Sequence, residues 1–232
     1  MFSGLGGELL KYSLLKQTSL NFKNRDFEFK SSDVFHIIFL TIISLILFYF
    51  SKETSEIKAI LWGMHPNHFV NTITKSELFK NDFPVNIEGY SSSLYMNTYV
   101  VLNNLFDVPV AFTADIFMLM QAFLLVFALN HLVHSFDGNK IMAALVILIF
   151  LTNNLPGSNL ANFGDGLRNQ VQPLYYGFAQ AFRLFSISYF LRGNAHLGLT
   201  CVFMSIVGHP IIGLSGCILI LGIIVANPRN YC

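Results

Sequence analysis

The chain has 232 residues, of which 53% are hydrophobic and only 12% are charged, and its mean hydropathy is +0.55. A soluble domain carries roughly twice this charged fraction, because its surface must face water. The formal net charge of +1 gives no electrostatic basis for binding nucleic acid, which calls for a concentrated basic patch. The three cysteines show no C-x-x-C spacing, so the sequence predicts neither a disulfide framework nor a zinc site. The composition therefore predicts an all-α, multi-pass membrane protein.

Apolar stretches that span or nearly span a bilayer recur along the chain. A spanning helix needs about 20 largely apolar residues, and residues 34–50 approach that length. Residues 1–33 before them are polar and bear several lysines, which is typical of a cytoplasmic tail and not of a cleaved signal peptide. Further apolar stretches follow at 109–131, 141–152, 174–191 and 195–226.

The last of these stretches is interrupted by Gly208-His209-Pro210. Proline removes a backbone donor and disfavours helical geometry in the residue before it. The stretch is also longer than the about 20 residues that one span requires, so we expect two short helices that meet at His209-Pro210. One long kinked helix is the alternative. Residues 34–226 are therefore predicted to form a transmembrane helical bundle with about six membrane segments.

The distribution of lysine and arginine sets the predicted orientation. The side that holds both termini carries more of these residues, so the termini are expected in the cytoplasm. Residues 51–108 and 153–173 then form outer loops. Residues 95–105 in the first loop are amphipathic, as expected for a helix in the membrane interface. Residues 227–232 are interpreted as a truncated cytoplasmic end of a longer protein.

The first outer loop offers one well-defined carboxylate, Asp82, within Asn81-Asp82-Phe83-Pro84. A carboxylate that faces an extracytoplasmic cavity can accept a proton from a hydroxyl nucleophile or hold a divalent cation. The alternative is that Asn81-Asp82 caps a turn. Glu88, in the same loop, lacks such local definition. Asp82 is therefore the predicted catalytic residue.

Two histidines, His65 and His68, lie in the same loop. They are close enough in sequence to share a metal ion, and His65 is our candidate for a substrate contact. A pair of solvated loop histidines is the alternative, and two histidines alone do not predict a metal site.

The second outer loop brings four polar side chains just before an aromatic segment: Asp165, Arg168, Gln170 and Gln172. The planar guanidinium of Arg168 suits bidentate binding of a phosphate, and the glutamine amides can bond sugar hydroxyls. This cluster predicts a substrate-binding surface. An ordinary hydrophilic loop with aromatic interfacial anchors is the alternative.

Among the ionisable residues inside the predicted membrane segments, three are candidates for a functional role: Asp115, Arg183 and His209. A charged side chain at the bilayer centre costs roughly 2.5–3.5 kcal/mol on insertion scales, and it usually pairs or lines a wet cavity. We expect Asp115 to pair with Arg183; alternatively, Arg183 neutralises a lipid phosphate. His209 either contacts a pyrophosphate or an acceptor, or is a hinge histidine bonded to a local carbonyl.

Several short motifs occur in a fixed order along residues 34–226. They are H-P-x-x-F at 65–69, N-D-F at 81–83, Q-P at 172–173, L-R-G-N at 191–194 and G-H-P-x-x-G-L at 208–214. In this order of features the chain resembles the N-terminal half of uncharacterised bacterial multi-pass proteins related to the C-type glycosyltransferase (GT-C) superfamily.

The resemblance implies a membrane-embedded transferase with an acidic residue in its first outer loop, and Asp82 occupies that position. It also implies a polyprenyl-phosphate-linked sugar as donor, with the lipid phosphate as leaving group and an extracytoplasmic acceptor. The location that the resemblance implies is the bacterial inner membrane, and the expected partners are thus the lipid bilayer and this donor. Arg168 and His209 are candidates for phosphate contacts because of their location.

Two other functions stay open, and the placement of polar residues distinguishes them. An enzyme predicts that Asp82, Arg168 and His209 converge on one outer cavity. A transporter or flippase-like component predicts that Asp115, Arg183 and His209 converge near mid-membrane. A structural subunit predicts no convergent site.

Overall fold

The computed structural model describes residues 31–61, 66, 70–71, 94–152, 171 and 176–226. Within these ranges all regular secondary structure is helical, which confirms the predicted all-α class. The chain divides into two units, Met1–Phe35 and His36–Cys232. The described residues of the first unit, 31–35, form the beginning of helix α2.

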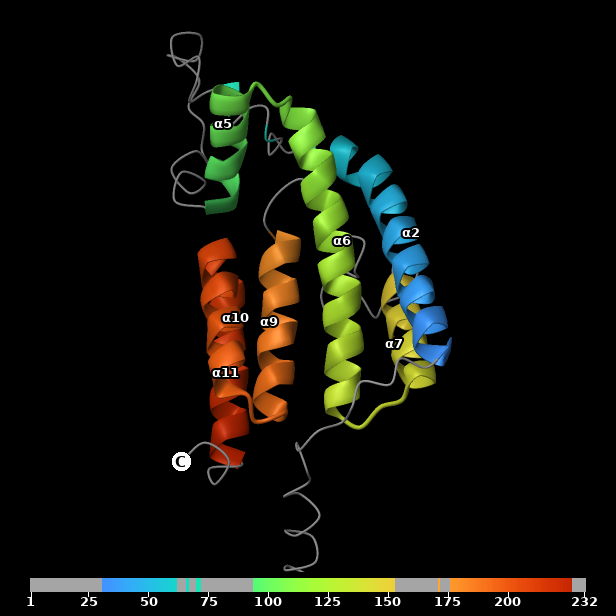
Figure 1. Ribbon diagram of the computed structural model, residues 1–232. Helices are drawn as coiled ribbons and strands as arrows, with labels where there is room; N and C mark the ends of the chain where they lie inside the picture. The colour runs from blue at the N-terminus through green and yellow to red at the C-terminus, as the bar shows by residue number, and fades with distance from the viewer. Residues whose placement is uncertain are drawn as a thin grey trace, which may run out of the picture. The chain divides into compact units, whose positions relative to one another are not determined.

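Seven helices follow one another along the described chain (Figure 1): α2 (Ser31–Leu61), α5 (Leu94–Phe106), α6 (Val110–Ser135), α7 (Lys140–Thr152), α9 (Tyr176–Leu191), α10 (Ala195–Gly208) and α11 (Pro210–Ala226). Each apolar stretch predicted to cross the membrane thus contains a helix. Helix α2 continues well beyond the predicted end at residue 50. Helix α5 coincides with the amphipathic segment, and it buries Met96 and Tyr99 on one face.

Among the described helices, two are long and apolar enough to cross a membrane, over Ser31–Lys52 and Val110–Ser135. Helices α10 and α11, and Lys140–Phe150 within α7, are apolar but shorter. The described helices of spanning length are therefore fewer than the six membrane segments expected. The difference arises because an apolar composition does not fix where a helix begins and ends, and α7 has only 13 residues.

The break at His209-Pro210 is confirmed as the boundary between two helices. Helix α10 ends at Gly208, His209 is extended with φ −152° and ψ 109°, and α11 begins at Pro210. A Cβ at Gly213 would lie 2.6 Å from the backbone of Ile206, so only glycine lets α11 fold back this closely on α10. The two helices therefore form a tight hairpin.

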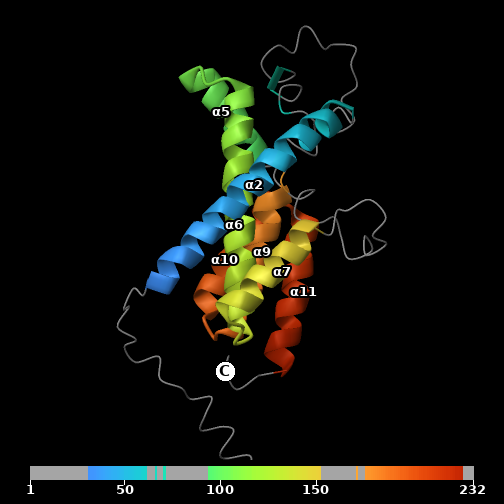
Figure 2. The same ribbon diagram turned by 90° about the vertical axis from the view of Figure 1, so that its right-hand side faces the viewer.

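Helix α9 is the centre of the packing, because it contacts α6, α10 and α11. It runs parallel to α6: the rings of Phe117 and Phe178 meet at 5.4 Å near one end, and His131 bonds Ser188 near the other. Figure 1 and Figure 2 show α6 and α9 side by side. Helix α10 runs antiparallel to α9, since Ser205 Oγ donates to Ala179 O at 2.8 Å. The alignment of α9 with α6 and α10 sets which residues of those helices lie beside each polar residue of α9.

Candidate functional site

Six of the predicted site residues lie outside the described residues: His65, Asp82, Asp165, Arg168, Gln170 and Gln172. Their roles, and their convergence on one outer cavity, stay predictions. Three predicted residues lie in described helices or at their ends, namely Asp115, Arg183 and His209. The structure therefore tests the predicted contacts of the intramembrane group.

Asp115 pairs with Lys52, and not with Arg183 as expected. Lys52 Nζ donates to Asp115 Oδ2 at 2.7 Å, and both side chains are about half exposed, at 40% and 36%. Phe178 lies beside Phe117, so Arg183 lies roughly 10 Å further along the parallel helices than Asp115. The helix register thus gives the Asp115 carboxylate a different partner, Lys52. The sequence predicted that Lys52 lies in the outer loop 51–108.

The Lys52–Asp115 pair is a polar tie between α2 and α6. At the other end of the helix pair, His36 Nε2 donates to Asn130 Oδ1 at 2.8 Å. The two ties show that the helices run antiparallel, and at 1.5 Å per residue they lie roughly 24 Å apart along α2. Three buried apolar side chains of α2 lie between them, in one core cluster with residues of α6 and α7: Leu40, Ile43 and Leu47. Asp115 therefore contributes to helix packing at the edge of an apolar interface.

Arg183 lies halfway along α9, between α9 and α11. Its Nη1 donates to Ser215 Oγ at 2.9 Å, and Ser215 Oγ donates in turn to Ile212 O at 2.7 Å. A Cβ at Gly216 would lie 3.0 Å from Arg183 Cγ, so the absence of a side chain there makes room for the arginine stem. Arg183 has no carboxylate partner in the described part of the chain.

The guanidinium also keeps one donor unsatisfied. Arg183 Nε is buried and has no hydrogen-bond partner among the described residues. An unpaired buried polar group typically costs about 1–3 kcal/mol, and more when it is charged. A cation held in this way, without a counter-charge, is suited to binding an anion.

Arg183 is the innermost member of a polar stripe on α9, formed by Tyr176, Gln180 and Arg183. Their spacing of four and then three residues places them on one face of the helix. Gln180 Oε1 is also buried without a partner in the described part of the chain. The next residue on this face is Ile187, which is apolar. The stripe therefore starts at the beginning of α9 and ends halfway along it.

His209 lies near the start of the stripe, where its ring contacts Tyr176 at 5.0 Å between centroids. Its backbone N–H donates to Ser205 O at 2.8 Å, and its Nδ1 accepts from the Ile212 N–H at 3.3 Å. These bonds link the end of α10 to the first turn of α11. His209 therefore acts as a cap in the hinge, and it also lines the end of the α9 stripe.

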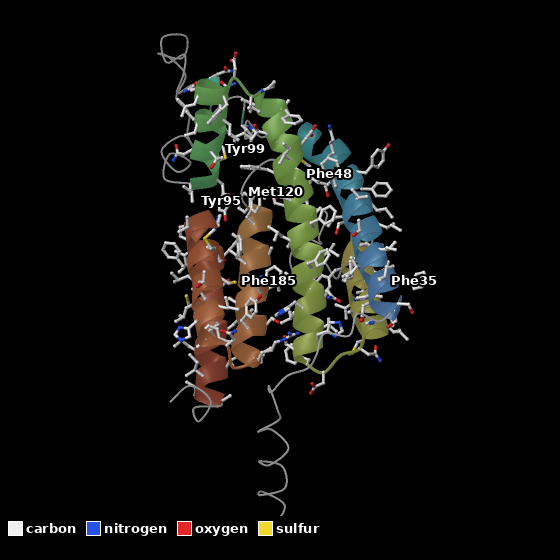
Figure 3. The ribbon with its side chains drawn as sticks, in the orientation of Figure 1. Phe35, Phe48, Tyr95, Tyr99, Met120 and Phe185 are labelled. Atoms are coloured by element: carbon white, nitrogen blue, oxygen red, sulfur yellow. The ribbon has the colours of Figure 1, made fainter. Side chains whose placement is uncertain are left out.

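Tyr95 on α5 packs against the same ends of α9 and α10 (Figure 3). Its ring stacks on Phe178 at 4.7 Å, and a Cβ at Gly208 would lie 3.1 Å from it. Burial raises the pKa of Tyr95 to about 12, so the phenol stays protonated at neutral pH. Its hydroxyl is buried without a partner in the described ranges, and it is the third such atom beside those of Gln180 and Arg183.

A second polar cluster joins the far ends of α6 and α9. Arg192 Nε donates to Ser135 Oγ at 3.0 Å and Arg192 Nη2 donates to His131 O at 3.1 Å, while Ser188 Oγ also bonds His131 O at 3.0 Å. These bonds converge on the His131 carbonyl in the last turns of α6 and tie it to α9. The polar atoms bond one another, so we assign this cluster a structural role.

Sequence reasoning missed four polar contributors: Lys52 as the partner of Asp115, and Tyr95, Gln180 and Ser215 near the stripe. The spacing of Tyr176, Gln180 and Arg183 in the sequence is the helical periodicity that indicates a polar helix face. The role of Ser215 depends on how α11 folds back, which local sequence does not specify.

The sequence matches no protein-family model, no curated protein sequence and no solved structure. Among the described residues, no three histidine, cysteine, aspartate or glutamate side chains gather closely enough to hold a metal ion. The candidate site is thus defined by its own geometry: a one-ended polar stripe with an uncompensated cation at its inner end.

Proposed function

We propose that this chain is a multi-pass protein of the bacterial inner membrane that acts as a GT-C-like glycosyltransferase. It moves a sugar from a polyprenyl-phosphate donor to an extracytoplasmic acceptor. The observation that carries the proposal is Arg183, a cation without a carboxylate partner in the described helices, at the inner end of a polar stripe. A lipid-linked phosphate supplies the missing negative charge.

Exposed apolar side chains support the membrane location. On α11 they recur every three or four residues along one face: Ile211, Leu214, Ile218, Leu221 and Val225. On α7 a similar face exposes Ile141, Leu145, Leu148 and Ile149. Large exposed apolar surfaces mark interfaces with a membrane or a partner protein. With a charged fraction of only 12%, a bilayer is the environment that suits them.

The short helices α7, α9, α10 and α11 are compatible with a membrane bundle. They have 13 to 17 residues and measure roughly 20–26 Å, against a hydrocarbon core of about 30 Å. Local thinning of the bilayer accommodates helices of this length at modest cost. We therefore retain six membrane segments in the proposal, with the start of α9 on the outer side.

In the proposed reaction, the acceptor hydroxyl oxygen attacks the anomeric carbon of the sugar and Asp82 takes the hydroxyl proton. The bond between the anomeric carbon and the phosphate oxygen breaks, and the lipid phosphate leaves. The negative charge on the lipid phosphate rises from one to two in this step. Arg183 stabilises the developing charge, and the low dielectric of the membrane strengthens that interaction.

The one-ended stripe favours an enzyme over a transporter. A transport path needs polar groups through the whole membrane, whereas this stripe ends at Arg183 and continues with Ile187. Asp115, which the transporter hypothesis placed beside Arg183, is bonded to Lys52. A structural subunit gives no reason for an unpaired cation in the bundle.

Substitution of Asp82 tests the transferase proposal. Membranes containing the full chain are given labelled polyprenyl-phosphate sugars, and transfer of the label from the lipid to acceptors is measured. We expect Asp82→Asn to slow transfer by roughly 10²–10⁴-fold, because the acceptor hydroxyl loses its general base. Glu88→Gln, a carboxylate substitution in the same loop, is the matched control and should retain activity.

Two outcomes would count against this proposal. Unchanged turnover in Asp82→Asn removes the catalytic assignment of that residue. Failure of the wild-type chain to transfer any polyprenyl-phosphate-linked sugar contradicts the transferase activity itself.

A further inference from the structure

We propose that Gln180 recognises the sugar of the donor, by accepting a hydrogen bond from the hydroxyl on the carbon next to the anomeric centre. This inference rests on the proposed function, because it takes the anion at Arg183 to be the donor phosphate. It adds a specificity-determining residue, and it predicts that the lipid phosphate alone is an incomplete ligand.

The unsatisfied atoms of Gln180 and Arg183 are complementary to such a ligand. Arg183 Nε is a buried donor and Gln180 Oε1 is a buried acceptor, each without a partner in the described part of the chain. A phosphate oxygen accepts from the first, and a hydroxyl donates to the second. Buried Gln121 on α6, in contrast, has a partner, so unsatisfied glutamines are not a general feature of these helices.

The spacing of the two residues matches the distance between the two ligand groups. Residues three apart on a helix are neighbours, with about 5–6 Å between their Cβ atoms. A hydroxyl on the carbon next to the anomeric centre is separated from the phosphorus by only a few bonds. One turn of α9 therefore lets a single glycosyl phosphate reach both side chains.

The direction of the stripe also agrees with this ligand. From the start of α9 inwards the order is Tyr176, Gln180 and Arg183. A polyprenyl-phosphate sugar that enters from the outer side has its sugar outermost, then its phosphate, then its lipid tail. The sugar thus meets Gln180 when the phosphate meets Arg183, and the tail extends towards the apolar residues beyond.

Binding of four lipids to the purified full chain in nanodiscs tests the inference. The lipids are polyprenyl phosphate, its glucosyl and mannosyl esters, and the 2-deoxyglucosyl ester, which is the deoxy form of both sugars. We expect the wild-type chain to bind a glucosyl or mannosyl ester about fivefold or more tightly than the deoxy ester, as for one added hydrogen bond. Gln180→Met should abolish this ratio and leave the affinity for polyprenyl phosphate unchanged.

The comparison of the four lipids and the variants distinguishes failure of the sugar contact from failure of the proposed function. Suppose that Arg183→Met weakens the binding of all four lipids equally, but that the wild-type chain binds the glucosyl or mannosyl ester with the same affinity as the deoxy ester. The sugar contact is then refuted, and phosphate binding at Arg183 stands. A ratio above one that persists in Gln180→Met also refutes the role of Gln180. If no lipid binds the wild-type chain, both proposals are wrong. The comparison with the deoxy ester uses wild-type protein, so it does not depend on the folding of a variant.

Discussion

Arg183→Met is expected to slow sugar transfer by roughly 100-fold or more without making the protein less stable. Transfer falls because the charge that develops on the leaving phosphate loses its stabilising cation, and loss of one such group costs about 10²–10³ in rate. Stability is retained because Arg183 has no carboxylate partner in the described chain. Methionine fills a similar volume with no charge to bury. Transfer assays and thermal unfolding of the same preparation measure the two effects.

Arg192→Met is the matched control, because it removes an arginine just beyond the other end of α9. Arg192 bonds Ser135 and the carbonyl of His131, so its loss should lower the unfolding temperature and leave sugar transfer unchanged. Equal effects of the two substitutions on transfer and on stability would contradict the role proposed for Arg183. A marked loss of stability in Arg183→Met, with normal transfer, would assign Arg183 a purely structural role.

Gly213→Ala is expected to disrupt the α10–α11 hairpin and cost about 3 kcal/mol of stability, near the upper end for overpacking. The added Cβ would lie 2.4 Å from Ile206 Cγ1 and 2.6 Å from both Ile206 Cα and Ile206 N. Backbone atoms cannot rotate away, so the two helices must separate. The yield of monodisperse protein and its unfolding temperature measure the loss.

Gly222→Ala provides the comparison on the same helix. A Cβ at Gly222 meets no heavy atom within 4 Å, and alanine has a higher helix propensity than glycine by about 1 kcal/mol. This variant should therefore be as stable as the wild type or slightly more so. Equal stability of Gly213→Ala and Gly222→Ala would contradict the close packing of the hairpin.

Local sequence was sufficient to predict the helices but not their ends. Proline at 210 and the length of the last apolar stretch identified the boundary between α10 and α11, because proline acts on the residues next to it. Helix α2 nevertheless continues to Leu61, through the polar residues that follow the apolar stretch ending at Phe50. Polar residues are compatible with helix, so a drop in hydropathy marks a change of environment and not the end of a helix.

Partners across helices were harder to predict than the helices themselves. Asp115 and Arg183 are the obvious opposite charges inside apolar stretches, yet the parallel register of α6 and α9 separates them. Lys52 reaches Asp115 because α2 runs antiparallel to α6. Register depends on the packing of many side chains at once, and isolated charges do not specify it.

Accessibility of two positions on α9 tests most directly whether the polar stripe opens to the outer side and ends at Arg183. Single cysteines are placed at Gln180 and Ile187 in a chain whose Cys201, Cys217 and Cys232 are replaced, and a membrane-impermeant maleimide is added to intact cells or to inside-out vesicles. We expect the reagent to label Gln180→Cys in intact cells only, and to label Ile187→Cys in neither preparation. Labelling of Gln180→Cys from the cytoplasmic side, or equal labelling of both positions, would contradict a one-ended site on the outer face.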